Sequence, residues 1–262
     1  MIFAAKPAVV GHRGCGRDTS CGFRENTVES CLAAVEAGLT WLEIDAQRTA
    51  DDELVLRHDW TAPDGSRVVD RTAADLSAQG IARLADVFAA VPPEIAIDID
   101  VKTVLADAAD PKARRTGTLL AAALSTESRR RRLLVTSFDP GLLVALRPEV
   151  PGVALGLLTW LHFPPQHGIP AAAGLGLDAI CLHTGSMRPA GGPGDGAGED
   201  RHPFPTAGEA VSAAHEAGLE VLIWCPDAGA AASYAAAGAD ALCVDDVPGT
   251  LAALASWAAL AS

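Results

Sequence analysis

The chain has 262 residues, with 33 Asp or Glu against 20 Lys or Arg, so its formal net charge at pH 7 is −13. This acidic balance argues against a nucleic-acid binder or a membrane-surface protein, although a few local cations could still hold a phosphate in a pocket. Hydrophobic residues make up 49% of the chain, enough for a large core. Because barrels routinely reach this length, we expect one domain over residues 1–262.

The sequence offers no sign of membrane insertion or export. No apolar run reaches the roughly 18–20 residues that cross a bilayer, and the first residues lack the pattern of a secretory leader. We therefore expect a cytoplasmic protein without stable membrane association. Six cysteines occur without a Cys-x-x-Cys pair, and we expect free thiols, which a reducing compartment maintains. Cys15 and Cys21, which flank a loop, could instead form a bridge.

Strand-like and helix-like segments alternate along the whole chain. The predicted strands are Ala8–Gly11, Trp41–Asp45, Ile95–Val101, Leu133–Thr136, Val153–Leu157, Ala179–Leu182, Val221–Trp224 and Ala241–Val244. The predicted helices are Thr27–Ala37, Arg83–Val91, Lys112–Ser125, Pro140–Leu146, Ala207–Ala217, Gly229–Ala236 and Val247–Leu260. Such alternation predicts parallel strands with crossover helices. A count of eight strands favours closure into a (β/α)₈ TIM barrel.

Two polar segments interrupt this alternation. Asp59–Ala78 is rich in turn residues and predicts a small excursion after the second strand. Thr184–Pro205 follows the sixth strand and contains Gly-Gly-Pro-Gly-Asp-Gly-Ala-Gly, which excludes a regular element. We leave open whether this loop is a surface connection or a lid over a site. The basic run Arg129–Arg132 is predicted to be a solvated helix end.

The start of the first helix has two interpretations. Asn26 is placed to cap the helix, with Glu29 reaching back in a capping box. Glu25 and Asn26 could therefore be ordinary helix-start residues or part of a functional site. Asp59 is similarly open, because it could orient the histidine before it or simply begin the next turn.

Two predicted strands each carry carboxylates on one face. Side chains alternate along a strand, so Glu43 and Asp45 point to the same side. In Ile95–Lys102 the isoleucines and the valine occupy one face, while two aspartates and the lysine occupy the other. In a barrel the apolar face packs on the helices, so the charged face points into the barrel.

Glu43, Asp45 and Asp100 are therefore expected to converge near the carboxyl ends of these strands. Several oxygen ligands at one point suit a single Mg²⁺ or Ca²⁺ ion rather than Zn²⁺. The alternative is a buried ion-pair network in which Arg13 and Lys102 neutralise the carboxylates.

Two histidines are candidates for proton transfer. His12 and Arg13 follow the first strand between two glycines, and His58 follows the apolar stretch at residues 54–56. Two imidazoles at a barrel mouth could divide the duties of general base and general acid near neutral pH. Arg13 and Lys102 would supply cations for a phosphate.

In order along the chain, these motifs resemble the signature of the glycerophosphodiester phosphodiesterase family. The matching segments are Gly11-His12-Arg13-Gly14, Glu25-Asn26-Thr27, Glu43-Ile44-Asp45, His58-Asp59 and Asp100-Val101-Lys102, followed by Ser137-Phe138, Trp224, Gly238-Ala239-Asp240, Asp245-Asp246 and Pro248. The resemblance extends over essentially the whole chain, and the ordered set is far more specific than any one motif.

The resemblance implies a (β/α)₈ barrel that hydrolyses glycerophosphodiesters to glycerol 3-phosphate and an alcohol. It also implies site roles: one divalent cation on Glu43, Asp45 and Asp100, acid–base catalysis by His12 and His58, and phosphate binding by Arg13 and Lys102. In such enzymes the glycerol hydroxyl attacks the phosphate, the second histidine protonates the departing alcohol, and water opens the resulting cyclic phosphate. The implied partner is thus a small-molecule phosphodiester.

The sequence departs from the family pattern at three places. Asp100 stands where the family usually has Glu, the loop Cys15–Arg24 is longer than the usual connection, and Trp224 is followed by Cys-Pro-Asp rather than Thr-Val-Asn. We expect these changes to alter the choice of substrate rather than to remove a catalytic group.

Other functions remain to be weighed. A lysophospholipid or another phosphodiester would need an apolar groove, for which the segment 163–165, Phe-Pro-Pro, is a modest candidate. A non-catalytic phosphate-binding barrel would have no need of two histidines beside acids. A barrel isomerase or aldolase would want a Schiff-base lysine, and only Lys6, Lys102 and Lys112 are present.

Overall fold

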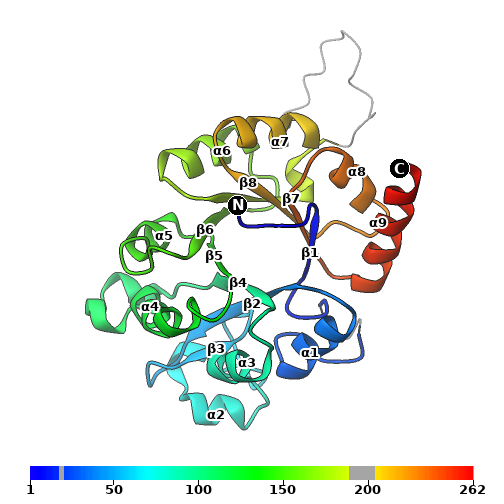
Figure 1. The fold of residues 1–262 in the computed structure, drawn as a ribbon. Helices are drawn as coiled ribbons and strands as arrows, with labels where there is room; N and C mark the ends of the chain where they lie inside the picture. The colour runs from blue at the N-terminus through cyan, green and yellow to red at the C-terminus, as the bar shows by residue number, and fades with distance from the viewer. Residues whose placement is uncertain (18–20, 189–203, 262) are drawn as a thin grey trace.

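The computed structural model describes residues 1–17, 21–188 and 204–261 (Figure 1). Eight parallel strands form a closed barrel in the order β1-β9-β8-β7-β6-β5-β4-β2, and pairing of β1 with β2 closes the ring. The strands are β1 (Ala8–Gly11), β2 (Trp41–Arg48), β4 (Ala96–Val101), β5 (Leu133–Ser137), β6 (Ala154–Leu158), β7 (Ala179–His183), β8 (Glu220–Trp224) and β9 (Ala241–Val244). The predicted (β/α)₈ barrel and all eight predicted strands are confirmed.

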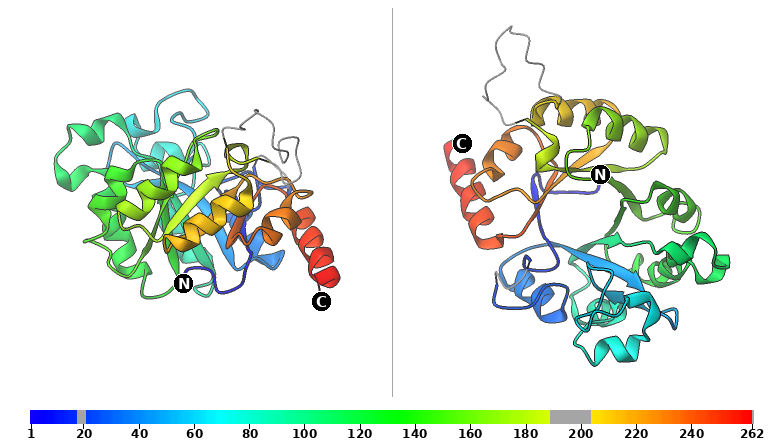
Figure 2. Two further views of the ribbon diagram at one scale, coloured as in Figure 1. Left: turned by 90° about the horizontal axis from the view of Figure 1, so that it is seen from above. Right: turned by 180° about the vertical axis from the view of Figure 1, so that it is seen from behind.

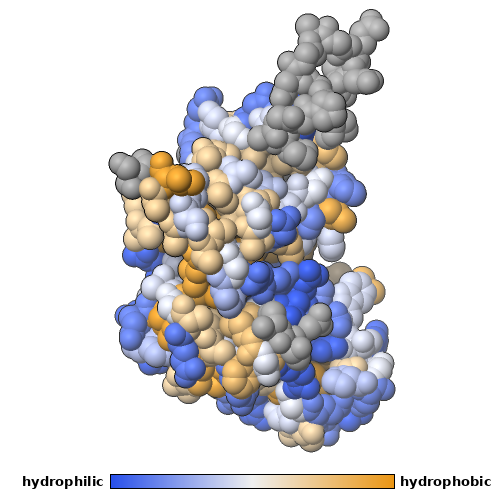
Figure 3. Space-filling view, turned by 90° about the vertical axis from the view of Figure 1, so that its right-hand side faces the viewer, coloured by the Kyte–Doolittle hydropathy of each residue, from blue (hydrophilic) through white to orange (hydrophobic). Residues whose placement is uncertain are grey.

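Helices surround the strands on the outside of the ring in both the front and the rear views (Figures 1 and 2). They are α1 (Val28–Glu36), α2 (Ala73–Ser77), α3 (Leu84–Ala90), α4 (Thr116–Glu127), α5 (Pro140–Leu146), α6 (Pro165–Gly174), α7 (Ala207–Glu216), α8 (Ala231–Ala236) and α9 (Val247–Ala261). Short 3₁₀ turns cover Val68–Asp70, Leu105–Ala108, Lys112–Arg114 and Thr184–Ser186. The outer side of α9, at the left in Figure 3, is pale to orange, and Leu260 near its end is exposed.

The predicted division of strand faces is confirmed. On β4, Ile97 and Ile99 belong to the large apolar cluster between the strands and the helices. Ala96 belongs instead to a smaller cluster inside the barrel, where Phe3 packs against Trp41 with ring centroids 4.9 Å apart. The amino-terminal segment therefore closes one end of the barrel and leaves the carboxyl ends of the strands for the polar side chains.

The predicted excursion after the second strand exists, but it begins earlier than expected. Strand β3 (Leu54–Leu56) pairs antiparallel with the end of β2, and the sequence analysis did not recognise it as a strand. A small separate core then holds the excursion together, composed of Val55, Ala62, Val68, Ala73, Leu76 and Ile81. A second unpredicted element is α6, which begins at Pro165, a first helical position at which proline is well tolerated.

The predicted cap of the first helix is wrong. The cap of α1 is Thr27, whose hydroxyl accepts a hydrogen bond from the backbone N–H of Ser30 at 3.1 Å. Asn26 does not cap the helix, because its backbone has a φ of 55° and its side chain bonds to a strand residue. Most of Thr184–Pro205, the loop predicted after the sixth strand, lies outside the described residues.

The basic run at residues 129–132 is not a uniformly solvated helix end, as we expected. Arg131 is only 5% exposed and forms an ion pair with Glu127. Its guanidinium also donates to backbone carbonyl oxygens of Phe88, Val91, Pro92 and Ile95. These carbonyls lie at the end of α3 and in the following turn, so Arg131 satisfies polar groups that the helix leaves without partners.

The cysteines divide into two groups. Cys15 and Cys21 form a disulfide, so the expectation of free thiols is wrong for this pair. Cys31, Cys181, Cys225 and Cys243 are free, as expected. Within the described residues, no helix combines the length and the apolar character needed to span a membrane.

Candidate active site

A cavity of about 370 Å³ opens at the carboxyl ends of the barrel strands. It is lined by all seven residues singled out from the sequence, namely His12, Arg13, Glu43, Asp45, His58, Asp100 and Lys102. Ends of parallel strands meet at this side of a barrel, and barrel enzymes carry their active sites there. The predicted convergence of these side chains is thus observed.

Strand register brings the carboxylates together. Asp45 pairs with Asp100, and Glu43 pairs with Asp98, across β2 and β4. One oxygen from each of Glu43, Asp45 and Asp100 lies within 4.8 Å of the others. Burial, followed by the charges of the neighbouring aspartates, raises the pKa of Glu43 well above 4.5. Ionisation of all three carboxylates at once is therefore unfavourable without a further cation.

Lys102 and Arg13 neutralise part of this charge. The Lys102 ammonium donates to Asp100 and forms an ion pair with Asp45 Oδ1 at 2.8 Å. The Arg13 guanidinium lies 3.4 Å from Asp45 Oδ2 and donates to Glu25 at 2.8 Å. Although burial alone would raise the pKa of Asp45, these two cations outweigh it and lower that pKa to about 2.

The backbone turn after β1 explains the two glycines around His12 and Arg13. A Cβ on Gly11 would lie 1.9 Å from the carbonyl oxygen of Gly14, and Gly14 itself has a φ of +95°. Arg13 also has a left-handed φ of 53°, and its N–H donates to Glu43 Oε2 at 2.8 Å. The tight turn thereby ties the end of β1 to a carboxylate of β2.

Each of the two histidines is held by a carboxylate. His12 Nδ1 lies 2.7 Å from Asp245 Oδ1, and His58 Nδ1 lies 2.9 Å from Asp59 Oδ1. An ionised carboxylate only accepts hydrogen bonds, so Nδ1 carries the proton in both rings and Nε2 is left as the basic nitrogen. The His12 Nε2 atom lies 3.9 Å from Glu43, at the edge of the carboxylate group.

The donor set fits a hard divalent cation. Four carboxylates, those at positions 43, 45, 98 and 100, face the cations of Arg13 and Lys102 in the cavity. Within the described residues, Asp100 Oδ1 is a buried oxygen without a hydrogen-bond partner. An ion-pair network accounts for the contacts of Arg13 and Lys102 but leaves this oxygen and the raised pKa of Glu43 without compensation. All-oxygen groups of this kind suit Mg²⁺ or Ca²⁺.

The structure adds polar residues that the sequence analysis left aside or open. The Asn26 amide donates to Asp45 Oδ2 at 2.7 Å, and its oxygen accepts from the Asp45 N–H at 3.0 Å. Asp98 lies deeper in the barrel and accepts from the Thr136 hydroxyl at 2.9 Å, while burial raises its pKa well above 3.8. Asp245 was noted only within a family motif, since nothing in the local sequence indicates that it contacts a histidine 233 residues away.

Aromatic side chains form an aromatic wall of the same cavity, and the Lys102 ammonium lies over its Phe138 ring, 5.6 Å from the centroid. Phe138 stacks on Trp160 with ring centroids 4.1 Å apart, and Trp224 meets Phe138 edge-on at 6.0 Å. Trp60 lines the cavity next to His58. The buried indole N–H of Trp224 has no partner among the described residues. The cavity thus combines charged groups, suited to a phosphate, with aromatic rings, one of which carries an unsatisfied donor.

A closed (β/α)₈ barrel with ionisable side chains gathered at the carboxyl ends of its strands has the architecture of a TIM-barrel enzyme. The chain belongs to the glycerophosphoryl diester phosphodiesterase family, whose model matches residues 12–248. This match confirms the resemblance predicted from the ordered motifs.

Several known proteins are similar to this chain in sequence or in structure. A glycerophosphocholine phosphodiesterase of Candida albicans is 44% identical over 57 residues, which are 20% of this chain and only 5% of that longer protein. A candidate glycerophosphodiester phosphodiesterase from Galdieria sulphuraria has a TM-score of 0.77 at 22% identity and covers 95% of this chain and 98% of its own. An Oleispira antarctica phosphodiesterase, solved with the product sn-glycerol 3-phosphate, has a TM-score of 0.73 at 20% identity, covering 95% and 97%. At these identities the structural likeness shows the fold.

Proposed function

We propose that the protein hydrolyses glycerophosphodiesters to glycerol 3-phosphate and an alcohol. The observation that carries this proposal is the meeting, in one cavity, of two carboxylate-held imidazoles with the group of Glu43, Asp45 and Asp100. Family membership and the product bound by the Oleispira antarctica relative support the same reaction. A non-catalytic phosphate-binding barrel would not need two imidazoles fixed with Nε2 free.

Glu43, Asp45 and Asp100 would hold one divalent cation, Mg²⁺ or Ca²⁺. Such an ion supplies positive charge that offsets the charge of the phosphodiester. Arg13 and Lys102 line the same cavity and would bind the phosphate oxygens, the guanidinium as a fork and the ammonium as a point charge. The phosphate would thus be bound on the charged side of the cavity and the alcohol nearer the aromatic wall.

His12 and His58 would move the protons. With Nδ1 bonded to Asp245, His12 Nε2 can take the proton of the glycerol hydroxyl as that oxygen attacks phosphorus. His58, held by Asp59, then protonates the departing alcohol oxygen. The same pair acts in the opposite sense when water opens the cyclic phosphate, because a group that donates a proton in one step can accept it in the next.

The test is release of glycerol 3-phosphate from glycerophosphocholine and glycerophosphoethanolamine, with Mg²⁺, Ca²⁺ or Mn²⁺ and with chelator. We expect metal-dependent release that falls about 10²–10⁴-fold in His12→Ala, since positioned acid–base groups typically contribute this much. A folded sample without release on a broad panel of phosphodiesters would exclude the proposal and favour the non-catalytic barrel.

An apolar groove favours a second candidate, a diester whose alcohol carries a hydrocarbon chain. A cavity of about 480 Å³ beside the first has an apolar part formed by Trp60, Val69, Val104 and Leu105, and charged residues such as Arg67 complete its lining. Trp60 borders both cavities and follows His58 closely in the chain, on the side proposed to protonate the alcohol. The Phe-Pro-Pro segment proposed from the sequence is not among the described lining residues of either cavity.

Chain-length dependence distinguishes the two candidates. If the groove holds a hydrocarbon chain, kcat/KM rises with the chain length of the leaving alcohol in a series of glycerophospho-n-alkanols, and Trp60→Ala abolishes this rise while sparing glycerophosphoethanolamine. A kcat/KM that does not change with chain length would rule out this use of the groove. In either case the partner is a small-molecule phosphodiester.

The cytoplasmic location stays a prediction, and the Cys15–Cys21 disulfide argues against a reducing compartment.

A further inference from the structure

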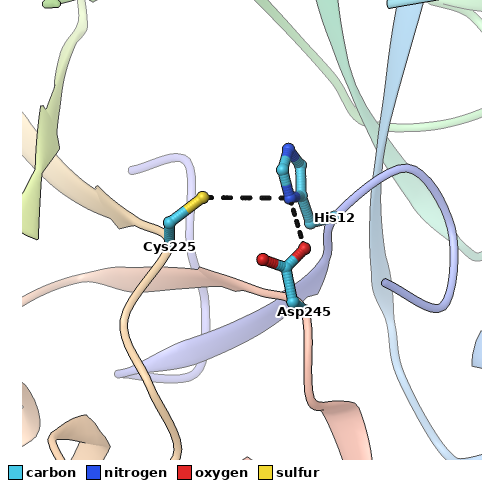
Figure 4. A group of neighbouring side chains, drawn as sticks. All are labelled: His12, Cys225 and Asp245. Carbon is cyan, nitrogen blue, oxygen red and sulfur yellow. Dashed lines mark hydrogen bonds and ion pairs between the residues drawn. The ribbon is translucent and has the colours of Figure 1, made fainter. Parts of the chain in front are cut away.

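Beside the carboxylate group lies a second cluster of a different composition, formed by His12, Cys225 and Asp245 (Figure 4). Its members follow three adjacent strands, β1, β8 and β9, at their carboxyl ends. The sulfur of Cys225 lies 4.0 Å from His12 Nδ1, and Asp245 Oδ1 lies 2.7 Å from the same nitrogen. Figure 4 shows the thiol and the carboxylate approaching this nitrogen from two directions.

The spacing of these atoms matches a metal site. One ligand atom from each residue lies within 4.8 Å of the other two. Tetrahedral Zn²⁺ with bonds of about 2.0–2.3 Å holds its ligand atoms roughly 3.3–3.8 Å apart. Small side-chain shifts would therefore bring all three atoms to bonding distance. The fourth position would be left to water.

The composition of this cluster favours a different class of metal ion from the class that the carboxylate group favours. Sulfur and imidazole nitrogen are ligands for Zn²⁺, Cd²⁺ and similar ions, whereas Mg²⁺ and Ca²⁺ prefer oxygen alone. The sulfur comes from one of the positions at which this chain departs from the family pattern, where Cys225 stands in place of threonine. The Arg17 guanidinium donates to Asp245 Oδ2 at 2.8 Å, whereas Oδ1 accepts from the Arg17 backbone N–H at 3.2 Å and lies 2.7 Å from His12 Nδ1.

We propose that His12, Cys225 and Asp245 form a second metal site, specific for thiophilic divalent cations such as Zn²⁺, and that filling it inhibits the enzyme. Binding forms bonds from the metal to Cys225 Sγ, His12 Nδ1 and Asp245 Oδ1. The thiol proton leaves to solvent, and the imidazole proton on Nδ1 is replaced by the metal, so that the ring carries its proton on Nε2 instead.

The inhibition follows from this change of tautomer. Once Nε2 is protonated, His12 has no basic nitrogen directed at the glycerol hydroxyl. Asp245 is also withdrawn from the hydrogen bond that positions the ring. This consequence rests on the proposed function, whereas metal binding itself does not.

Binding is tested with Cd²⁺, whose bond to a thiolate gives an ultraviolet charge-transfer band. The full chain is titrated with Cd²⁺ in the presence of saturating Mg²⁺, beside Cys225→Ser and the matched control Cys31→Ala, which removes another free thiol. We expect the band in the wild type and in Cys31→Ala but not in Cys225→Ser. An identical band in all three proteins, or none in the wild type, would overturn the proposed site.

Inhibition is tested with Zn²⁺ at saturating Mg²⁺, each variant being normalised to its own activity without Zn²⁺. We expect Cys225→Ser to require at least about 10-fold more Zn²⁺ for half-inhibition than the wild type, since loss of a ligand weakens a metal site strongly. Equal inhibition of both would contradict the proposal. Because the Cd²⁺ band needs no turnover, an absent phosphodiesterase activity would leave the result on the metal site intact.

Discussion

The side chain of Asn26 bonds twice to Asp45: its amide donates to Oδ2 at 2.7 Å, and its oxygen accepts from the backbone N–H at 3.0 Å. This pair connects the residue before α1 to the end of β2. One carboxylate oxygen is thereby turned toward Asn26, while Oδ1 faces the cavity and Lys102. A residue expected to cap a helix instead orients a candidate metal ligand.

Substitution of Asn26 should therefore weaken metal binding rather than unfold the protein. Asn26→Asp retains the size of the side chain and a residue type that tolerates a φ of 55°, but it replaces the amide donor with a carboxylate. We expect the divalent-cation concentration for half-maximal activity to rise about 10- to 100-fold, as when other partners of metal ligands are lost. A metal titration of activity measures it. An unchanged half-saturation would show that Asn26 does not act on the metal.

The contact between Asp245 and His12 can be separated from general effects of charge at the cavity rim. Asp245→Asn keeps a side chain of the same shape but no longer fixes the proton on Nδ1. We expect kcat to fall by about 10²-fold or more, by analogy with loss of the orienting carboxylate in other histidine catalysts. The neighbouring Asp246 bonds to the backbone N–H of Gly249 instead. Asp246→Asn is thus the matched control, and an equal fall in both variants would remove Asp245 from its positioning role.

The carboxylate group should make the metal-free protein less stable than a variant with one fewer charge. Because the pKa of Glu43 is raised, its ionisation opposes folding, and stability is lost as the pH rises through that value. Glu43→Gln still accepts the Arg13 N–H bond. We expect it to raise the free energy of unfolding of the metal-free protein by about 1–2 kcal/mol at pH 8.

Thermal unfolding with and without Mg²⁺ completes this test. The wild type should gain stability on metal addition, by about 2.7 kcal/mol at a hundredfold excess over Kd. Glu43→Gln should show little gain. A metal response of equal size in both proteins would show that Glu43 is not a ligand.

The hydrogen bonds of the buried Asp240 carboxylate should make the stability of the fold sensitive to acid. It accepts bonds from Lys6, from the Val221 backbone and from His215, which together outweigh burial and hold its pKa below 3.8. A lowered carboxyl pKa stabilises the fold above pH 3.8, and this contribution disappears as the pH falls through the folded-state value. We expect Asp240→Asn to lose about 2 kcal/mol at pH 7. Urea unfolding at several pH values should show that the difference in the free energy of unfolding between the wild type and Asp240→Asn becomes smaller in acid. A difference that does not change with pH would refute this account.

Arg131 and Arg129 offer a direct comparison within one basic run. Arg131→Met would remove the side-chain donor to the buried carbonyls at the end of α3 and would leave Arg130 as the remaining ion-pair partner of the Glu127 carboxylate. We expect a loss of about 3–5 kcal/mol in the free energy of unfolding. Arg129→Met, on the exposed side, should change it by less than about 0.5 kcal/mol. Urea denaturation measures both, and similar losses would contradict the structural assignment.

The barrel and the meeting of its site residues could be predicted because they depend on short-range pattern. The alternation in β4 fixes which face is charged, and register then places Asp100 beside Asp45 without further information. The grouping of the candidate metal-binding carboxylates and the position of His12 follow from strand ends alone. Strand alternation is thus sufficient where function is built directly on the barrel.

Features that depend on long-range contacts could not be predicted in this way. The basic run at Arg131 is locally indistinguishable from a solvated helix end, and only the position of the turn after α4 beside the end of α3 buries Arg131. β3 has just three residues and pairs antiparallel, unlike the surrounding parallel pattern. The contacts of Asp245 and Cys225 with His12 require closure of the ring between β9 and β1.

The excursion that begins at β3 has its own apolar core, and His58 belongs to it rather than to the parallel ring. His12, by contrast, is fixed to β1. The proposed acid and the proposed base are therefore carried by two different segments of the chain, which are connected where Gln47 of β2 donates to the His58 carbonyl oxygen at 3.2 Å. On the proposed mechanism, replacement of the segment between β2 and α3 would alter which alcohols can leave, while the proposed base and the candidate metal ligands keep their places. New substrate preferences could thus evolve by exchange of one short module, with the rest of the barrel inherited unchanged.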